Sequence, residues 1–269
     1  MFQHFLITRF NLKLEEWQTT KKGEPVVSEA WLKNRFELFN TYCLPSVTQQ
    51  TNQNFKWLVC FDSETPDVFK TKVSEISHSY PNFKPLYLSA STNIIDVLTA
   101  EIKLYLTSSD THIITTRMDN DDALHKSFIE TIQRAFKSQD PFIVDAVRGF
   151  QFIPGKKSDV VRIMNVAYNP FLSFVEYCDN FQTILSRPHL EWHDTQHVIL
   201  NTQPLWMQVI HDQNISNAEK LNFPETNDFC ANNFGNPKTK LKSEFAIRLS
   251  TIWSFFKRVL IKLKIVSLL

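Results

Sequence analysis

The chain has 269 residues, a formal net charge of +1 and 43% hydrophobic residues, including 23 phenylalanines. This length and composition can bury a sizeable core, so one α/β domain with a small appendage is expected rather than two equal domains. The four cysteines contain no CxxC pair, so neither a disulfide framework nor a zinc knuckle is indicated and a reduced, cytoplasmic setting is the default. The four glycines match neither a GxGxxG fingerprint nor the Walker A spacing, which argues against a dehydrogenase-type dinucleotide site and a P-loop.

The charge is unevenly distributed along the chain. Eight lysines and arginines lie between residues 238 and 264 against the single acid Glu244, so this tail carries +7 and the rest of the chain −6. In a nucleic-acid-binding protein, basic residues are expected across the binding surface and not only in a tail. No nucleic-acid partner is therefore indicated. A mildly acidic body with a basic tail is instead typical of a protein that touches anionic lipid. The first residues lack the features of a signal peptide and are interpreted as a core strand, and no stretch is long and apolar enough to span a bilayer.

Strand and helix patterns alternate through the first half, as is typical of an α/β fold. Each expected strand is a short apolar run that stops at a polar loop, the position where α/β proteins place ligand-binding residues. Pro45 is expected to end the first helix, and Pro85 to place the third strand at a sheet edge or strand entry. The expected strands are 5–7, 55–61, 83–88 and 113–116, and the expected helices begin near 28, 91–93 and 123.

The pattern changes in the second half. Residues 142–150 and 160–164 are apolar runs on either side of a Pro-Gly-Lys-Lys turn, which predicts an antiparallel hairpin. Residues 188–197 are interpreted as a loop leading into a short helix. A last strand is expected over 205–210, closed by His211.

Periodicity also suggests the domain boundaries. Residues 214–242 have little periodicity and are rich in Asn and Pro, so they predict an irregular linker between the α/β domain, 1–213, and a C-terminal segment, 243–269. In that segment apolar residues recur at helical spacing on one side and most of the basic residues lie on the other. A basic amphipathic helix in the lipid headgroup layer explains both faces and is a candidate membrane anchor. The alternative is a helix that packs on the body or on a second copy, since Ile261 and Ile265 interrupt the polar face.

Three carboxylates follow the apolar run 113–116 within four residues: Asp119, Asp121 and Asp122. Oxygen ligands of this kind suit Mg²⁺ or Mn²⁺, and no thiolate or imidazole lies beside them to favour zinc. Asp122 is equally well explained as the cap of the following helix. An EF-hand is a poor fit, because Leu124 stands where that loop needs its glycine.

A second metal pattern competes with the acid cluster. His193 and His197 have the i, i+4 spacing of a zinc-protease helix, with Asp194 where that motif has glutamate. A zinc hydrolase would need a third ligand and a longer base, and it would leave Asp119 and Asp121 unexplained.

Four segments together resemble the bacterial rhamnosyltransferase family, nucleotide-sugar glycosyltransferases of the GT-A fold. They are Leu6-Ile7-Thr8-Arg9-Phe10-Asn11, Cys43-Leu44-Pro45-Ser46 with 55–62, Arg117-Met118-Asp119-Asn120-Asp121-Asp122-Ala123-Leu124, and Trp206-Met207-Gln208-Val209-Ile210-His211. The resemblance covers about residues 5–217 and leaves out the basic tail. It implies a GT-A-like mixed sheet flanked by helices, followed here by the amphipathic C-terminal helix.

The resemblance also implies roles for individual residues. Metal ligation is implied for Asp119, Asp121 and His211, and contact with the donor for Thr8, Arg9, Asp62, Arg117 and Asp119. Asp62 would lie by the nucleoside, and the two arginines would neutralise the phosphates. Asp194, or else Glu191, would act as the base that takes the acceptor proton, although the segment departs from the family's plain Glu-Asp pair. A cap at Asp194 and a surface histidine at His211 are the alternatives for those two residues.

The sequence therefore predicts a glycosyltransferase that depends on Mn²⁺ or Mg²⁺ and moves a sugar from a nucleotide-sugar donor, with inversion, to a cell-surface polysaccharide or lipid-linked acceptor. It would act at the inner face of the membrane, bound peripherally to the anionic surface. Rhamnose is suggested by the family name alone. A catalytically silent nucleotide- or glycan-binding relative is the alternative, and a zinc hydrolase is a weaker one.

Overall fold

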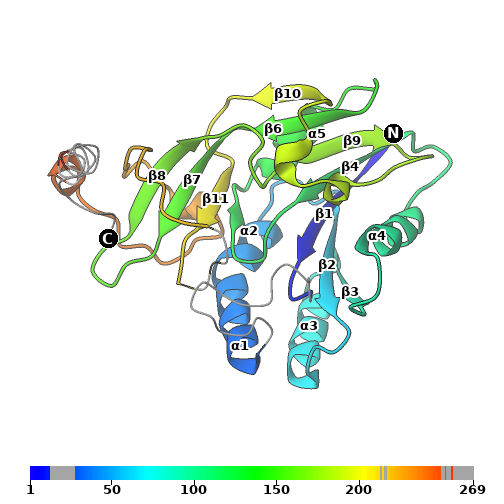
Figure 1. The fold of residues 1–269 in the computed structure, drawn as a ribbon, viewed down its shortest axis with the longest axis horizontal. Coiled ribbons are helices and arrows are strands. Elements are labelled where there is room, and N and C mark those ends of the chain that lie inside the picture. The colour runs from blue at the N-terminus through cyan, green and yellow to red at the C-terminus, as the bar shows by residue number, and fades with distance from the viewer. Residues whose placement is uncertain (13–27, 213, 215–216, 250–251, 253–255, 257–269) are drawn as a thin grey trace.

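The computed structural model describes residues 1–12, 28–212, 214, 217–249, 252 and 256. Its larger sheet has the strand order β10-β6-β9-β4-β1-β2-β3 and its smaller sheet the order β5-β11-β7-β8 (Figure 1). The strands of the larger sheet are β1 (Phe2–Arg9), β2 (Lys56–Asp62), β3 (Phe83–Leu88), β4 (His112–Arg117), β6 (Phe142–Ala146), β9 (Ser173–Tyr177) and β10 (Gln196–Leu200). Those of the smaller sheet are β5 (Ala123–Leu124), β7 (Arg148–Ile153), β8 (Val160–Asn165) and β11 (Trp206–Val209).

Helices cover both faces of the larger sheet. They are α1 (Glu29–Leu38), the π-helical turn η1 (Phe39–Cys43), α2 (Leu44–Thr48), α3 (Asp67–Ser79), α4 (Ile94–Lys103) and α5 (Phe128–Arg134). Alternate residues of β1 face opposite sides, because successive side chains of a strand do so. Leu6 packs with α1, α3 and α5 residues in one cluster, while Phe5 and Ile7 pack with α4 residues in another. The expected α/β fold, a mixed sheet flanked by helices, is confirmed.

The four parallel strands β1 to β4 form the part of the sheet that positions the site. β1 pairs in parallel with β2 and β4, and β3 lies at the edge, where its proline removes no inner ladder bond. β9 is antiparallel to β4 and β6. The carboxyl ends of β1, β2 and β4 therefore meet at one edge of the sheet.

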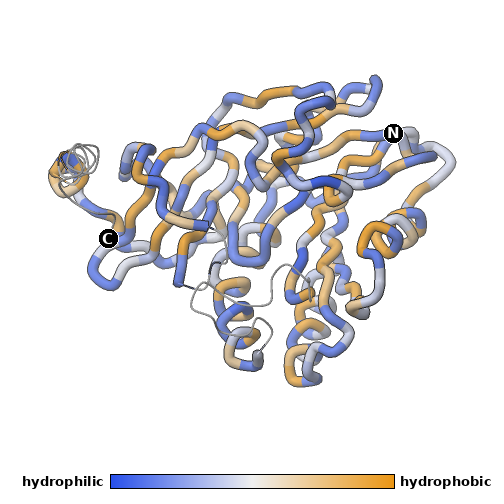
Figure 2. Tube along the Cα trace, viewed as in Figure 1, coloured by the Kyte–Doolittle hydropathy of each residue, from blue (hydrophilic) through white to orange (hydrophobic). Residues whose placement is uncertain are grey.

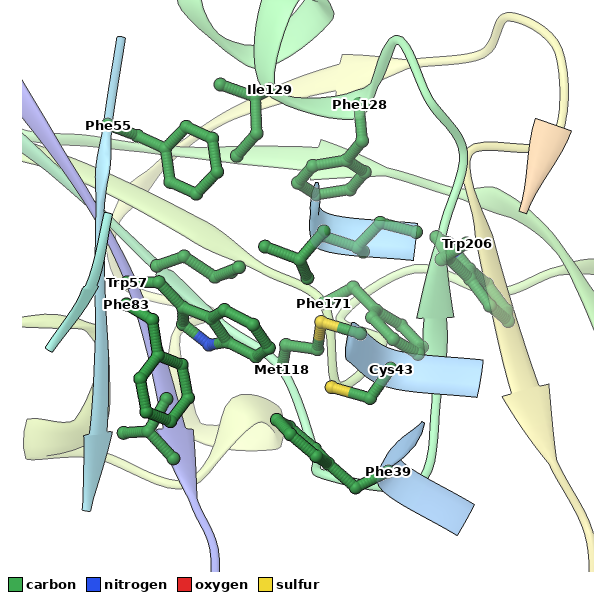
Figure 3. Close-up of a cluster of buried hydrophobic side chains, with 14 of the residues drawn as sticks. Phe39, Cys43, Phe55, Trp57, Phe83, Met118, Phe128, Ile129, Phe171 and Trp206 are labelled. Atoms are coloured by element: carbon green, nitrogen blue, oxygen red, sulfur yellow. The ribbon is translucent and has the colours of Figure 1, made fainter. Parts of the chain in front are cut away.

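The core is largely aromatic. Figure 2 shows hydrophobic residues along the strands and helices, and many of the loops are hydrophilic. In Figure 3, Trp57 of β2, Met118 after β4 and Trp206 of β11 belong to one buried cluster that joins the two sheets. This shared core fixes the loop after β4 against the smaller sheet.

Two sequence predictions in the second half need correction. The run 142–150 divides at Val147 into β6, which joins the larger sheet, and β7, which forms the predicted hairpin with β8. The short helix expected after 188–197 is wrong: a 3₁₀ turn, η3 (His189–Glu191), is followed by β10, which pairs in parallel with β6. A parallel partner 54 residues away in the sequence leaves no local signal.

The helix expected near Ala123 starts at Phe128 instead, because Ala123 and Leu124 pair with β11 as strand β5. Asp122 is therefore not a helix cap. Pro45 does not end the first helical stretch either, since α2 follows the π-helical turn η1 without a break and Pro45 is its second residue.

Residues 217–242, most of the predicted linker, lie against the smaller sheet. Phe229 and Phe234 are buried with strand residues, and Arg162 of β8 forms ion pairs with Glu219 and Glu225. This stretch is therefore part of the folded body. The predicted C-terminal helix falls largely outside the described residues, which show helix at 244–249, 252 and 256. Across the described part of the chain, no helix has the length and apolarity to cross a membrane.

Candidate active site

The candidate site lies at the shared carboxyl edge of β1, β2 and β4, where open α/β sheets bind their ligands. Arg9 ends β1, Asp62 ends β2 and Arg117 ends β4. The Met118 amide donates a hydrogen bond to the Ile7 carbonyl at 3.0 Å, so the acid loop leaves the sheet beside the end of β1.

Asp121 is the most strongly held carboxylate of the cluster. Its buried Oδ2 accepts hydrogen bonds from Arg35 Nη1 at 2.5 Å, His211 Nε2 at 2.8 Å and Asn214 Nδ2 at 3.3 Å. Burial alone would raise the pKa of Asp121, but the Arg35 charge and His211 outweigh it and lower the pKa to about 2. Asp121 is thus a fixed, permanently ionised group.

Arg35 was not predicted from the sequence. It lies on α1, 86 residues before Asp121, and its guanidinium sits 4.9 Å from the centroid of the Trp31 ring. It also donates to Asn120 Oδ1 at 3.2 Å, and Asn120 in turn donates to the Phe10 carbonyl. The available signal was an arginine on the buried, aromatic face of an amphipathic helix, where a charge needs a partner.

Asp119 is more accessible than Asp121 and lies among arginines. Its side chain is 37% exposed and its Oδ1 is 3.6 Å from Arg117 Nη2. Arg9 is near both residues: burial lowers its pKa, the Asp119 charge raises it and Arg117 lowers it. The buried Nε of Arg117 has no hydrogen-bond partner among the described residues. An accessible carboxylate beside two arginines suits the binding of an anion, with a cation between the carboxylate and the anion.

Asp122 has a different character from its neighbours. It is 1% exposed, its Oδ1 accepts a hydrogen bond from the Val209 amide at 2.8 Å, and its Oδ2 has no partner in the described part of the chain. Burial first, and then the charges of Asp121 and Asp119, raise its pKa well above the usual value. Burial thus favours the neutral form of Asp122, and its side chain ties the loop to β11.

Two of the residues predicted to contact the nucleotide-sugar donor, Asp62 and Thr8, are buried. Asp62 is 2% exposed, and its Oδ1 accepts a hydrogen bond from the Glu64 amide at 2.7 Å, which shapes the loop after β2. Thr8 lies in the core, where its hydroxyl accepts a hydrogen bond from Trp57 Nε1 at 2.9 Å. This bond fixes β1 on β2, and contact of Thr8 with substrate stays a prediction.

The predicted bases lie in η3 and in the segment that follows it. The Asp194 carboxylate is on the surface, 2.7 Å from Arg187 Nη1, and Glu191 is exposed within η3. Asp194 does not cap a helix, because the chain there leads into β10. Its assignment as base stays a prediction.

The zinc-helix pattern is not realised. His197 is on β10 with its Nε2 3.0 Å from Asp145 Oδ2, and the His193 ring packs edge-on against Tyr168. The two histidines have helical spacing in the sequence, but the segment that contains them is not a helix: η3 ends at Glu191 and β10 begins at Gln196.

The donor set of the acid cluster fits a hard divalent cation. Within the described ranges, no three His, Cys, Asp or Glu side chains are grouped so as to hold a metal by themselves. Mg²⁺, however, is usually held by one or two carboxylates together with substrate phosphates. Asp121 and His211 already meet at 2.8 Å, close to the separation of two ligands on one ion, and Asp119 is the accessible second carboxylate. Asp121 and His211 are thus placed to hold an ion together with donor phosphates, with Arg35 fixing Asp121 from behind, and ligation by Asp119 stays a prediction.

The chain belongs to the family described as "Putative rhamnosyl transferase", which matches residues 3–222. This confirms the resemblance drawn from the four sequence segments. A comparison with curated proteins finds no match.

Among solved structures, the chain is similar to Staphylococcus aureus TarS 1-349, with 10% identity, a TM-score of 0.45 and coverage of 77% of this chain and 60% of that one. The same fragment in complex with UDP gives 12% identity, a TM-score of 0.44 and the same coverage. A "putative nucleotide-diphospho-sugar transferase" from Desulfovibrio desulfuricans G20 gives 8% identity, a TM-score of 0.38 and coverage of 78% and 82%. The chain thus spans about three fifths of the TarS fragment.

Proposed function

We propose that this chain transfers a sugar from a nucleotide-sugar donor to a glycan or lipid-linked acceptor, with inversion and with Mn²⁺ or Mg²⁺ held by Asp119, Asp121 and His211. The observation that carries the proposal is the Asp121 carboxylate, kept ionised between Arg35 and His211 beside the accessible Asp119. Family membership supports the reaction class. The identity of the sugar as rhamnose rests on the family description alone.

Each residue of the site has a task in this reaction. Arg9 and Arg117 lie beside Asp119 and neutralise the donor phosphates. Arg35, Asn120 and Asn214 hold the acid loop rigid, so little reorganisation is needed as negative charge develops. A divalent ion at this place supplies charge stabilisation of the departing nucleoside diphosphate.

Donor turnover tests the proposal directly. A panel of UDP- and dTDP-sugars is incubated with the protein and MnCl₂ or MgCl₂, and release of nucleoside diphosphate is measured. We expect turnover of at least one donor, lost on removal of the metal and reduced 10²-fold or more in Asp119→Asn, because the developing charge is left unbalanced. Asp179→Asn, an exposed acid after β9, is the matched control and keeps its activity. Metal-independent binding of nucleotide without any product would instead identify a catalytically silent relative.

We also propose that the C-terminal segment brings the enzyme to an anionic membrane at the cytoplasmic face. Phe245, Leu249, Ile252 and Phe256, spaced as on one helix face, are 52–72% exposed, and the sequence around them is strongly basic. We expect Phe245→Asp with Leu249→Asp to reduce sedimentation with phosphatidylserine vesicles. Leu104→Asp, which changes an exposed leucine on the body, is the control. Equal sedimentation of the two variants would reject the membrane contact.

A further inference from the structure

The imidazole of His189 has a fixed hydrogen-bonding pattern. His189 lies in η3, and its Nδ1 is hydrogen-bonded to the Tyr168 carbonyl. A carbonyl oxygen can only accept, so Nδ1 carries the proton and donates it. In the neutral ring this leaves Nε2 as a bare lone pair on the opposite side. Burial lowers the pKa of His189, with smaller contributions from its neighbours, so the neutral ring is the form present at neutral pH.

A buried carboxylate holds the Tyr168 loop in place. Asp145, at the end of β6 and fully buried, accepts hydrogen bonds from the Tyr168 amide at 2.7 Å, from Asn169 Nδ2 at 2.6 Å and from His197 Nε2 at 3.0 Å. The His197 ring also stacks on the Tyr168 ring at 4.5 Å between centroids. Tyr168 has a φ of 53°, a conformation that needs such external support. The carbonyl that orients His189 is therefore rigidly placed.

The same loop returns to the donor site. It ends at Leu172, whose carbonyl accepts a hydrogen bond from the Arg117 amide at 3.2 Å. The charged groups that act on His189 are Arg117 and Asp119 of the site and Lys220 of the segment beyond β11. His189 is thus within electrostatic range of the residues proposed to bind the donor diphosphate, and it stands on a different element from them.

We propose that His189 is the general base of the transfer reaction, an inference that rests on the proposed function. Its Nε2 takes the proton of a sugar hydroxyl on the acceptor while that oxygen forms a bond to the anomeric carbon of the donor. The bond from the anomeric carbon to the diphosphate oxygen breaks, and its electron pair leaves with the nucleoside diphosphate. The imidazolium then returns its proton to solvent. Asp145, Tyr168 and His197 are positioning residues for this base.

The variant His189→Asn tests the assignment. Asparagine keeps a side-chain N–H for the Tyr168 carbonyl and removes the basic nitrogen. We expect release of nucleoside diphosphate from the donor that the wild type uses to fall 10²- to 10⁴-fold, with unchanged affinity for UDP or dTDP. The acidic limb of the pH profile of kcat/KM, which lies below the ordinary histidine pKa in the wild type, should disappear in the variant. His193→Asn, a histidine of the same segment whose ring packs edge-on against the Tyr168 ring, is the matched control and keeps the wild-type profile.

Each outcome separates the inference from the proposed function. Unchanged turnover in His189→Asn, or a loss confined to Asp194→Asn, overturns the role of His189 while leaving the transferase intact. No turnover of any donor by the wild type overturns the proposed function and this inference with it. If His189→Asn does not fold, ¹⁵N spectra of the wild type decide: a protonated Nδ1 and a bare Nε2 at pH 7 support the assignment. An Nε2–H tautomer or an imidazolium at that pH overturns it.

Discussion

Replacing Asp121 with asparagine should reveal how strongly its carboxylate is bound. Asparagine has nearly the same shape but no charge, and it leaves Arg35 and His211 facing an amide instead of a carboxylate. The pKa of Asp121 falls from 3.8 to about 2 in the fold. That difference corresponds to about 2 kcal/mol of folding stability at pH 7, or a loss of about 4–8 °C in Tm.

The pH dependence identifies the carboxylate as the cause. Since the folded pKa lies below the unfolded value, the contribution is fully present above pH 4 or so and is lost as the pH falls through the folded pKa. The gap between wild type and Asp121→Asn in urea unfolding should therefore shrink to about half at pH 3. Asp119→Asn, whose side chain is 37% exposed, should change stability by about 1 kcal/mol or less. Two results would refute this prediction: equal unfolding free energies of wild type and Asp121→Asn at pH 7, or a difference between them that is the same at pH 7 and pH 3.

Further predictions concern burial. Gly149→Ala should lower stability by about 1–3 kcal/mol in thermal unfolding, because the new Cβ would lie 2.0 Å from the Trp206 ring; an unchanged Tm would show that this packing is loose. Burial raises the pKa of Glu176 to about 7, so the wild type should lose up to about 3 kcal/mol as the pH rises from 4.5 to above 7. Glu176→Gln should remove that slope in urea titrations, and a slope shared by both proteins would assign it elsewhere. Asp122→Asn, which replaces an acid whose neutral form is favoured by burial, should keep near wild-type stability between pH 5 and 8; a large loss there would contradict this prediction.

The sequence predicted those site residues that directly follow a strand. Asp119 follows a buried parallel strand, and parallel strands deliver their carboxyl ends to one edge, so Arg9, Asp62 and Arg117 could be placed together without coordinates. The family resemblance implied that His211 lies beside the acid cluster, and the structure brings its Nε2 to 2.8 Å from Asp121 Oδ2.

Long-range pairing explains what the sequence could not give. Asp122 and Ala123 look locally like the start of a helix, but their bonds go to β11, more than 80 residues later. β10 pairs with β6 across some 50 residues, so its alternation could not be told from a short helix or loop. Arg35 reaches Asp121 only because α1 packs against the sheet. Tertiary contacts overrode local preference in all three places.

The proposed reaction requires a metal ion that joins the acid cluster to the donor diphosphate. Titration calorimetry of UDP and dTDP with and without MnCl₂ measures this directly in the wild type and in Asp119→Asn. We expect Mn²⁺ to tighten nucleotide binding to the wild type at least about tenfold, about 1.4 kcal/mol, and to have no such effect in the variant. Equal affinity of the wild type in the presence and absence of Mn²⁺ would contradict the account.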